Sequence, residues 1–294
     1  MAGLTRALDA PGSGVDHCKP QAAVAASRSK AIAMRLLAII WAFVHAAVEQ
    51  EVAYRAELLG NLVRSLIGIG TTIGGIAVIF AHTRTLGGWS LDQALALLGI
   101  FTMVNGLVAS VLSPSLNKVV EEVRDGTFDY ILLKPVPSLF LASTRRLVVW
   151  HVADVLLGLA IFLLALTRLE VVPSGWDLAM FGLVMASGLT IVYAIWLALT
   201  SLVFWFVRVE NITMIFNLFF QTGRYPVEVY PIWLRQVLTF VFPVAFITTV
   251  PAQTITGRDP AVFLWLAPLI AALSVMVAIR FWHLGLSRYT SASS

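Results

Sequence analysis

Five long apolar runs constrain this chain more than any other feature of its sequence. They cover about residues 58–81, 94–116, 147–166, 178–206 and 261–282. A helix needs about 20 apolar residues to cross the hydrocarbon core of a bilayer, and each run is long enough. In lipid only helices and closed barrels satisfy every backbone polar group, and the alternating ten-residue segments of a barrel are absent from this sequence. The pattern predicts an all-α integral membrane protein.

The charge content excludes the soluble alternatives. Charged residues make up 12% of the chain, whereas soluble domains carry roughly 25%. A single soluble core also cannot bury this much apolar surface in 294 residues. The chain is therefore neither an ordinary soluble enzyme nor a disordered protein. Its net charge of +4 is better explained by basic cytoplasmic loops than by binding to nucleic acid.

The region between the fourth and the last run is apolar but broken. A stretch at about 211–221 is followed by Gly223-Arg224-Tyr225-Pro226, and the next stretch, at about 232–250, contains Arg235 and Pro243. Irregular backbone at membrane depth is tolerated where protein or a water-filled cavity shields it. We expect a fifth span from about Val209 and then re-entrant helices that do not cross, which makes six transmembrane helices.

The N-terminal part differs from the rest. Residues 1–30 are small, polar and interrupted by Pro and Gly, which predicts a disordered cytosolic tail. The apolar run 31–48 carries Arg35 and His45, and it could form a signal-peptide core, an interfacial helix or a further span. Arg35 and the lack of a cleavage site before Glu49 favour an interfacial helix over 31–57. The six-span domain then covers 58–285, and 286–294 is a cytosolic tail.

The distribution of Lys and Arg predicts the orientation. If the N-terminus is cytosolic, the outer side receives five arginines, and the cytosolic side receives the other 15 of the 20 basic residues. The outer five are Arg84, Arg168, Arg224, Arg235 and Arg258. Because cytoplasmic loops carry an excess of basic residues, we expect a multi-pass protein of the cell (inner or plasma) membrane with both termini in the cytosol.

Known catalytic motifs are missing. The sequence contains no phosphate-binding G-x-x-x-x-G-K-[ST], no H-E-x-x-H and no G-x-S-x-G. Its five histidines are scattered and Cys18 is its only cysteine, so neither a metal site nor an intrachain disulfide is expected. We expect a chain that is not itself an enzyme and binds no cofactor.

Few polar side chains interrupt the spans. Asn105, Asp154 and Asn217 are the candidate pathway residues. Since acids inside a membrane pair with neighbouring groups, we expect Asp154 to form an ion pair or a hydrogen bond with an adjacent helix. Gly70 and Gly74 stand in a G-x-x-x-G frame, which lets helices approach closely. Packing inside the subunit and dimerisation both fit that motif.

The most informative segment is 119–137, with the sequence VVEEVRDGTFDYILLKPVP. It starts as a charged helix, Gly126 allows a change of direction, and Phe128, Ile131 and Leu132 share one face of a second short helix. Such an element is either a docking helix or a helix lying on the lipid surface. In this segment acids outnumber bases, which disfavours an anionic membrane surface and favours docking.

At this point the chain resembles the permease subunits of ABC transporters of the exporter type 2. The run from Glu121 to Asp129, followed by Leu132-Leu133-Lys134-Pro135, is similar to the family's segment between spans two and three. Arg224-Tyr225-Pro226-Val227-Glu228-Val229-Tyr230-Pro231, followed by Pro243-Val244-Ala245-Phe246 and Pro251-Ala252, resembles its segment before the last span. A weaker match is Ala53-Tyr54-Arg55-Ala56-Glu57, and together these cover about 53–282.

The resemblance implies a mechanism. Two identical or similar permease subunits would form the translocation pathway and would be driven by separate ATPase subunits, which hold ATP and Mg²⁺. A cytosolic coupling helix between spans two and three would dock on the ATPase, with Gly126 as the bend and Phe128 as the apolar anchor. The coupling residues would be Glu121, Glu122, Arg124, Asp125, Gly126, Phe128 and Asp129. The segment with Tyr225, Pro226, Pro231, Pro243 and Pro251 would form a re-entrant outer gate, and the helix near Trp41 an interfacial elbow.

Two other classes of protein are alternatives to an ABC permease. An ion-coupled secondary transporter would require internal repeats and more buried charge, and 58–166 does not resemble 178–282. An intramembrane enzyme would require converging His, Asp or Ser groups. The scarcity of polar groups in the spans favours export of an apolar or amphipathic compound.

Overall fold

The computed structural model describes residues 41–42, 44–46, 49, 55–206, 210–258, 260 and 262–289. The predicted tail over 1–30 lies outside this part, and so does most of the predicted interfacial helix over 31–57, whose described positions between 41 and 49 are helical. The chain divides into Met1–Ala42 and Phe43–Ser294, and the elements below belong to the second unit.

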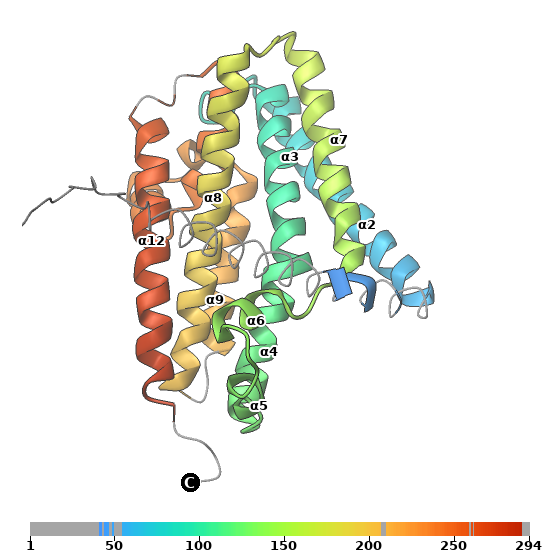
Figure 1. The fold of residues 1–294 in the computed structure, drawn as a ribbon. Helices are drawn as coiled ribbons and strands as arrows, with labels where there is room; N and C mark the ends of the chain where they lie inside the picture. The colour runs from blue at the N-terminus through green and yellow to red at the C-terminus, as the bar shows by residue number, and fades with distance from the viewer. Residues whose placement is uncertain are drawn as a thin grey trace, which may run out of the picture. The chain divides into compact units, whose positions relative to one another are not determined.

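Long helices form the second unit (Figure 1). They are α2 (Arg55–His82), α3 (Leu91–Leu107), α7 (Val152–Leu169), α8 (Gly175–Ser201) and α12 (Phe263–Leu286). Together with their continuations, they give 5 stretches that are long and apolar enough to cross a membrane. Among the described residues no β-strand occurs, only an isolated bridge between Leu86 and Trp89. The predicted all-α membrane fold is confirmed, and each of the five apolar runs is a long helix.

Helix α3 continues through a π-helical turn (Val108–Leu112) into α4 (Ser113–Arg124). Pro114, which has no backbone N–H, follows this turn, and the carbonyl of Ser110 instead accepts a hydrogen bond from Val148 N at 2.8 Å. Nearby, the Ser115 hydroxyl donates to the carbonyl oxygen of Arg146 at 2.7 Å and accepts from its N–H at 3.1 Å. The stretch 145–148 is thus attached to the helix where its own ladder is interrupted.

Helices α3 and α7 cross with their backbones in contact. A Cβ atom on Gly99 would lie 2.6 Å from Phe162 N, and one on Gly158 would lie 2.6 Å from Met103 N. In α2, by contrast, nothing among the described residues lies within 4 Å of a Cβ placed on Gly70 or Gly74. The G-x-x-x-G motif therefore makes no close contact with this part of the chain, and dimerisation stays a prediction.

The segment before α12 is broken into short pieces. Helix α9 (Glu210–Gln221) has 12 residues, about 18 Å, which is too short to cross a bilayer. The 3₁₀ turns η4 (Thr222–Arg224) and η5 (Val227–Val229) extend it. Two limbs follow, Ile232–Val241 and Ala245–Ile255, bent by 78° at the residues around Pro243. The first limb contains α10 (Ile232–Gln236), and the second contains α11 (Val250–Ile255).

Both ends of this bent pair meet at Glu228. The Arg235 guanidinium donates to the Glu228 carbonyl oxygen at 2.7 Å, and the Gln253 amide donates to Glu228 Oε1 at 2.8 Å. A segment whose two ends meet at one residue has the geometry of a re-entrant hairpin. The predicted total of six spans stays a prediction, since the long helices number 5, or 6 with the bent pair.

Candidate functional site

The turn after α4 is built on Gly126. Its φ is +71°, a left-handed conformation that glycine adopts without a Cβ penalty. Thr127 N donates to the Glu122 carbonyl at 2.9 Å and Gly126 N to the Val123 carbonyl at 3.3 Å, the pair of bonds that closes many helix C-termini. The predicted change of direction at Gly126 is therefore present, and it leads into the single-turn helix α5 (Asp129–Leu132).

Phe128 is not an exposed anchor, and that part of the prediction is wrong. Its side chain is 0% exposed and lies edge-on to the rings of Phe204, Trp282 and Tyr289, with centroids at 5.7, 6.2 and 5.6 Å. The turn at Gly126 folds the ring back under the bundle, where burial of its apolar surface is favourable. Burial, and then the nearby charge of Asp129, raise the pKa of the Tyr289 hydroxyl.

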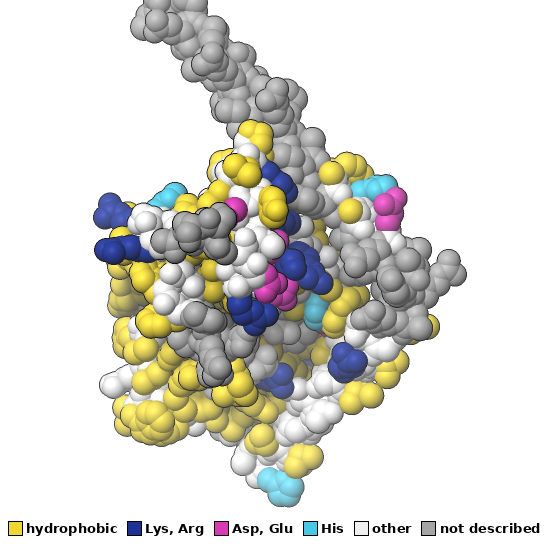
Figure 2. All heavy atoms as spheres, turned by 90° about the horizontal axis from the view of Figure 1, so that it is seen from below, with side chains coloured by type: hydrophobic (Ala, Val, Ile, Leu, Met, Phe, Trp, Pro, Cys, Tyr) yellow, Lys and Arg dark blue, Asp and Glu magenta, His cyan; other side chains and the backbone are white. Residues whose placement is uncertain are grey.

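Other side chains are exposed at this end of the molecule. Tyr130 is 71% exposed, Leu132 40% and Leu133 80%. We call these three residues the α5 tip. Figure 2 looks onto this end and shows acidic and basic side chains gathered beside hydrophobic ones. Of the predicted face, Leu132 is therefore exposed, whereas Phe128 and Ile131 point inward.

The predicted charged coupling residues differ in their surroundings. Glu122 forms an ion pair with Arg145 at 2.7 Å, and both side chains are only 16% exposed, so this pair joins α4 to the chain after α6 (Ser138–Thr144). Glu121 pairs with Lys118 at 2.9 Å, and Arg124 Nε lies 3.8 Å from Asp125, all on the surface. Asp129 is the first residue of α5.

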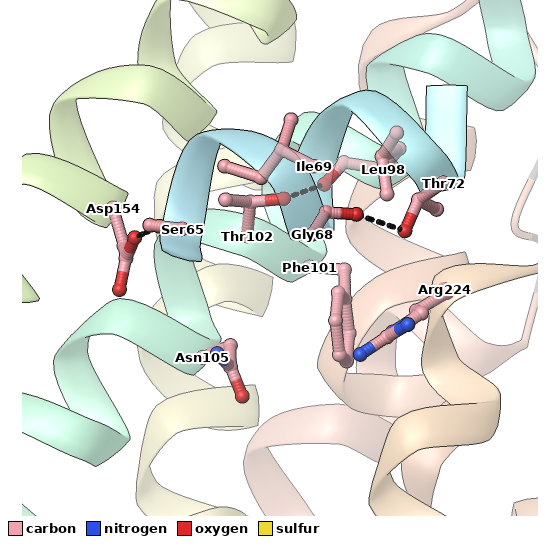
Figure 3. Close-up of a pocket in the computed structure, with 10 residues that line it drawn as sticks. All are labelled: Ser65, Gly68, Ile69, Thr72, Leu98, Phe101, Thr102, Asn105, Asp154 and Arg224. Carbon is pink, nitrogen blue, oxygen red and sulfur yellow. Dashed lines mark hydrogen bonds between the residues drawn. The ribbon is translucent and has the colours of Figure 1, made fainter. Parts of the chain in front are cut away.

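A polar cavity of about 160 Å³ lies among α2, α3, α7 and the turn η4 (Figure 3). Its lining is Ser65, Gly68, Ile69, Thr72, Leu98, Phe101, Thr102, Asn105, Asp154 and Arg224. The cavity brings together two of the three predicted pathway residues, Asn105 and Asp154. Figure 3 shows Asp154 beside Ser65 on one side and Arg224 against Phe101 on the other.

Asp154 is buried and has two partners. It accepts a hydrogen bond from the Ser65 hydroxyl of α2, and its Oδ2 lies 2.7 Å from Nδ1 of His151. The predicted bond to a neighbouring helix is confirmed. The partner itself, Ser65, is 89 residues away and carried no signal in the sequence.

Arg224 packs against the middle of α3. Its guanidinium lies 5.6 Å from the Phe101 ring centroid and donates to Gln221 Oε1 at 2.5 Å. Phe101 is ten residues into α3, about 15 Å along the helix axis. The sequence counted Arg224 on the outer side of the membrane, and that side stays a prediction.

Asn217 is separate from that cavity. It lines a second one, of about 500 Å³, between α4 and α9. The lining there is Asn117, Val120, Glu121, Arg124, Met214, Asn217, Leu218 and Gln221. Gln221 connects the two sites, because it lines the second cavity and holds Arg224 of the first.

The opposite end of the bundle holds a cluster centred on Glu228. The fully buried Trp89 donates from Nε1 to Glu228 Oε2 at 3.1 Å, while Arg258 lies 4.8 Å over the Trp89 ring and donates to the Gly88 carbonyl at 2.6 Å. Trp89 and Glu228 are 139 residues apart, so sequence reasoning missed the pair. The cluster ties the α2–α3 loop to the bent segment.

The predicted gate residues lie in and before this bent segment. Pro226, Pro243 and Pro251 are buried, Tyr225 is half-buried and Pro231 is exposed. Next to Pro231, the Tyr230 hydroxyl donates to the Thr222 carbonyl at 2.9 Å, and burial raises the pKa of Tyr230 to about 12, so that it remains a donor. Within the described residues, no group of three or more His, Cys, Asp or Glu side chains could hold a metal ion.

Long apolar helices, a polar cavity among them and a charged turn at one end define a multi-pass helical membrane protein with the features of a transporter. The family model of the ABC-2 family transporter proteins matches residues 66–293. The chain belongs to this family and is a membrane permease of an ABC transporter. No curated protein and no solved structure matches it significantly.

Proposed function

We propose that this chain is one of two permease subunits of an ATP-driven exporter in the cell membrane. It is not an enzyme and binds no cofactor, and separate ATPase subunits supply ATP and Mg²⁺. The α5 tip carries this proposal, because Tyr130 and Leu133 expose 71% and 80% of their surface beyond a charged helix, where a soluble partner reaches them. Apolar and aromatic side chains with charges around them are typical of protein interfaces.

Movement at the α5 tip would be transmitted by contacts that are already packed. Phe128 connects α5 to Phe204 after α8 and to Trp282 in α12. The Glu122–Arg145 pair connects α4 to the stretch that is attached to the π-helical turn of α3. Close-packed interiors transmit displacement because they have little free volume.

The open face of α2 supports a dimer. No described residue lies within 4 Å of a Cβ placed on Gly70 or Gly74, and Leu66 and Ile67 are 54% and 64% exposed. In lipid, small residues permit the close backbone contact that drives helix association. The occupant of this face is a second copy of the chain or a paralogous permease.

The α5 end faces the cytosol in this proposal, and both termini do as well. Lys118, Arg124, Lys134, Arg145 and Arg146 are concentrated between α4 and α7. Cytoplasmic loops of membrane proteins carry such an excess of basic residues.

Co-purification tests the proposal. The tagged chain, expressed with a P-loop ATPase encoded by a neighbouring gene, is expected to retain that ATPase. Leu133→Glu places a charge on the α5 tip and is expected to reduce the retained ATPase at least about tenfold, as for loss of a central apolar contact. Val172→Glu is the matched control, because Val172 is 92% exposed between α7 and α8 at the opposite end. Full retention by Leu133→Glu would contradict the docking role.

One observation favours an ion-coupled secondary transporter as the second candidate. His151, Asp154 and Ser65 form a hydrogen-bonded group in the bundle, of the type that proton relays use. Transport by the purified protein in vesicles without nucleotide, driven by a proton gradient, would select this candidate. Transport that requires ATP and the ATPase would exclude it.

A further inference from the structure

The polar cavity contains one acid and one base whose surroundings differ. Asp154 forms hydrogen bonds with the Ser65 hydroxyl and the His151 ring. Arg224 contacts only an amide oxygen and the ring of Phe101, and among the described residues no carboxylate pairs with it. Charged side chains at membrane depth almost always have a partner of opposite charge. Within the described residues, Arg224 is thus the charged side chain of this cavity that has no ion-pair partner.

The acid and the base are also separated in depth. The Cβ of Asp154 packs against Gly106 of α3, whereas Arg224 lies over Phe101. Five residues separate these levels, about 8 Å along the helix axis, and Figure 3 shows the two side chains on opposite sides of the cavity. The Asp154 carboxylate and the Arg224 guanidinium therefore lie at different levels of the cavity, and no ion pair joins them.

Two side chains of the cavity keep hydrogen-bond donors that a ligand can use. The hydroxyls of Thr72 and Thr102 donate to carbonyls of their own helices at 2.9 and 2.8 Å. The Asn105 amide has no partner in the part of the chain that the structure describes, so it and the Arg224 guanidinium remain available. Phosphate and carboxylate oxygens accept strong bonds from such donors.

The size of the cavity sets the size of its ligand. Pockets for drug-sized molecules have volumes of roughly 300–1,000 Å³, and this cavity has about 160 Å³. It therefore holds a headgroup and little more. Part of its wall is apolar, formed by Ile69, Leu98 and Phe101. Leu66 and Ile67 beside it on α2 are more than half exposed, so an attached hydrocarbon chain can lie along α2 in the lipid.

We propose that this cavity binds the anionic headgroup, a phosphate or a carboxylate, of an amphiphile, with Arg224 as its counter-ion and Asn105 as a second donor. That this amphiphile is the cargo rests on the proposed transport function, whereas the binding itself does not. The second cavity lies close to the first, because Gln221 of its lining accepts the hydrogen bond from Arg224.

Native mass spectrometry of the full chain, purified in its assembly in a neutral detergent, tests the proposal. Three lipids with the same dioleoyl chains are titrated: phosphatidic acid, phosphatidylcholine and trimethylammonium-propane. We expect phosphatidic acid to bind at least about tenfold more tightly than the other two, as for a charge-assisted bond to a guanidinium. Inorganic phosphate, which tests a free anion as the ligand, is expected not to compete at the same concentration.

Variants assign the preference to the cavity. Arg224→Gln is expected to remove it, and Arg224→Lys to retain part of it. Gly68→Leu fills the cavity without changing its charge, since nothing lies within 4 Å of a Cβ there, and is expected to weaken phosphatidic acid binding about as much as Arg224→Gln does. Arg168→Gln, at an exposed arginine outside the cavity, is the matched control and is expected to bind as the unmodified chain does.

Equal affinity for the three headgroups, or a preference that survives in both Arg224→Gln and Gly68→Leu, would overturn the proposal. Equally tight binding of inorganic phosphate would overturn its amphiphile part. The assay measures lipid binding without nucleotide and does not depend on retention of the ATPase, so its failure is separate from a failure of the docking test at the α5 tip.

Discussion

Three residues hold the turn at the α5 end in place. Gly126 supplies the left-handed backbone, Phe128 fills the space between α12 and the end of α8, and Glu122 forms the shielded ion pair with Arg145. Each contact is internal to the chain. The residues that shape this turn are therefore distinct from those of the α5 tip, which are exposed and can touch a partner.

This distinction predicts different results for two variants. Phe128→Ala leaves a cavity under the turn and is expected to lower the free energy of unfolding by about 3–5 kcal/mol, whereas Leu133→Ser, at an exposed position, changes it by less than about 0.5 kcal/mol. Both are expected to reduce ATP-coupled transport. Thermal unfolding in detergent and transport in vesicles measure the two effects, and an unchanged stability of Phe128→Ala would contradict its burial.

The ion pair makes a second prediction at this scale. Glu122→Gln leaves the shielded Arg145 guanidinium without its counter-charge and is expected to cost about 3 kcal/mol. Lys118→Gln breaks the ion pair between Lys118 and Glu121, two side chains that are 37% and 47% exposed. It is expected to lower the free energy of unfolding by at most about 1 kcal/mol. The same unfolding measurement compares them. A larger loss in Lys118→Gln would mean that the Glu122–Arg145 pair does not stabilise the turn.

Glycines lie at two kinds of helix face. Gly99 and Gly158 bring α3 and α7 into backbone contact, whereas Gly70 and Gly74 of α2 have no described residue within 4 Å of the Cβ position. The G-x-x-x-G frame drew attention to α2, but the close crossing inside the subunit uses glycines outside that frame. This crossing holds α7, and so Asp154, beside the cavity.

Alanine substitutions separate the two kinds of glycine. Gly158→Ala places a methyl group 2.6 Å from Met103 N and is expected to lower the free energy of unfolding by about 1–3 kcal/mol through overpacking. Gly74→Ala meets nothing inside the chain and is expected to leave the monomer as stable as before or slightly more so. The comparison is made on monomer in detergent. If Gly158→Ala is neutral there, the α3–α7 contact is looser than described.

For the whole molecule, the bundle presents two chemically different ends. The α5 end carries the charged turn and the α5 tip, and the opposite end carries the Trp89–Glu228 cluster that ties the bent segment to the α2–α3 loop. In the proposed transport function, we expect the two ends to respond to each other. The Phe128 packing at one end and the Glu228 hydrogen bonds at the other are the contacts that we expect to loosen or shift.

Cysteine labelling tests the orientation of these ends. In a Cys18→Ser background, which removes the only native cysteine, Leu133→Cys is expected to react with a membrane-impermeant maleimide from the cytosolic side alone. Val172→Cys, at a residue that is 92% exposed, is expected to react from the outside alone. Sealed right-side-out and inside-out vesicles provide the two accesses. Labelling in the reverse pattern would invert the proposed topology.

Several features of this protein were determined by sequence alone. The length and hydropathy of contiguous runs predicted the five long helices, and prolines among apolar residues predicted the broken segment before α12. Gly126 predicted the turn after α4. These features depend on neighbouring residues only, because the hydrogen bonds of a helix and the φ angle of a glycine are local.

Tertiary structure decided the contacts that make the site. It placed Phe128 inward although its spacing fits an exposed face, and it brought Arg224 against Phe101. It also chose Ser65 as the partner of Asp154 and Glu228 as the partner of Trp89. The sequence shows that an apolar side chain needs burial and that a charged side chain needs a partner. Which residues supply the burial or the partner depends on how helices far apart in the chain pack together.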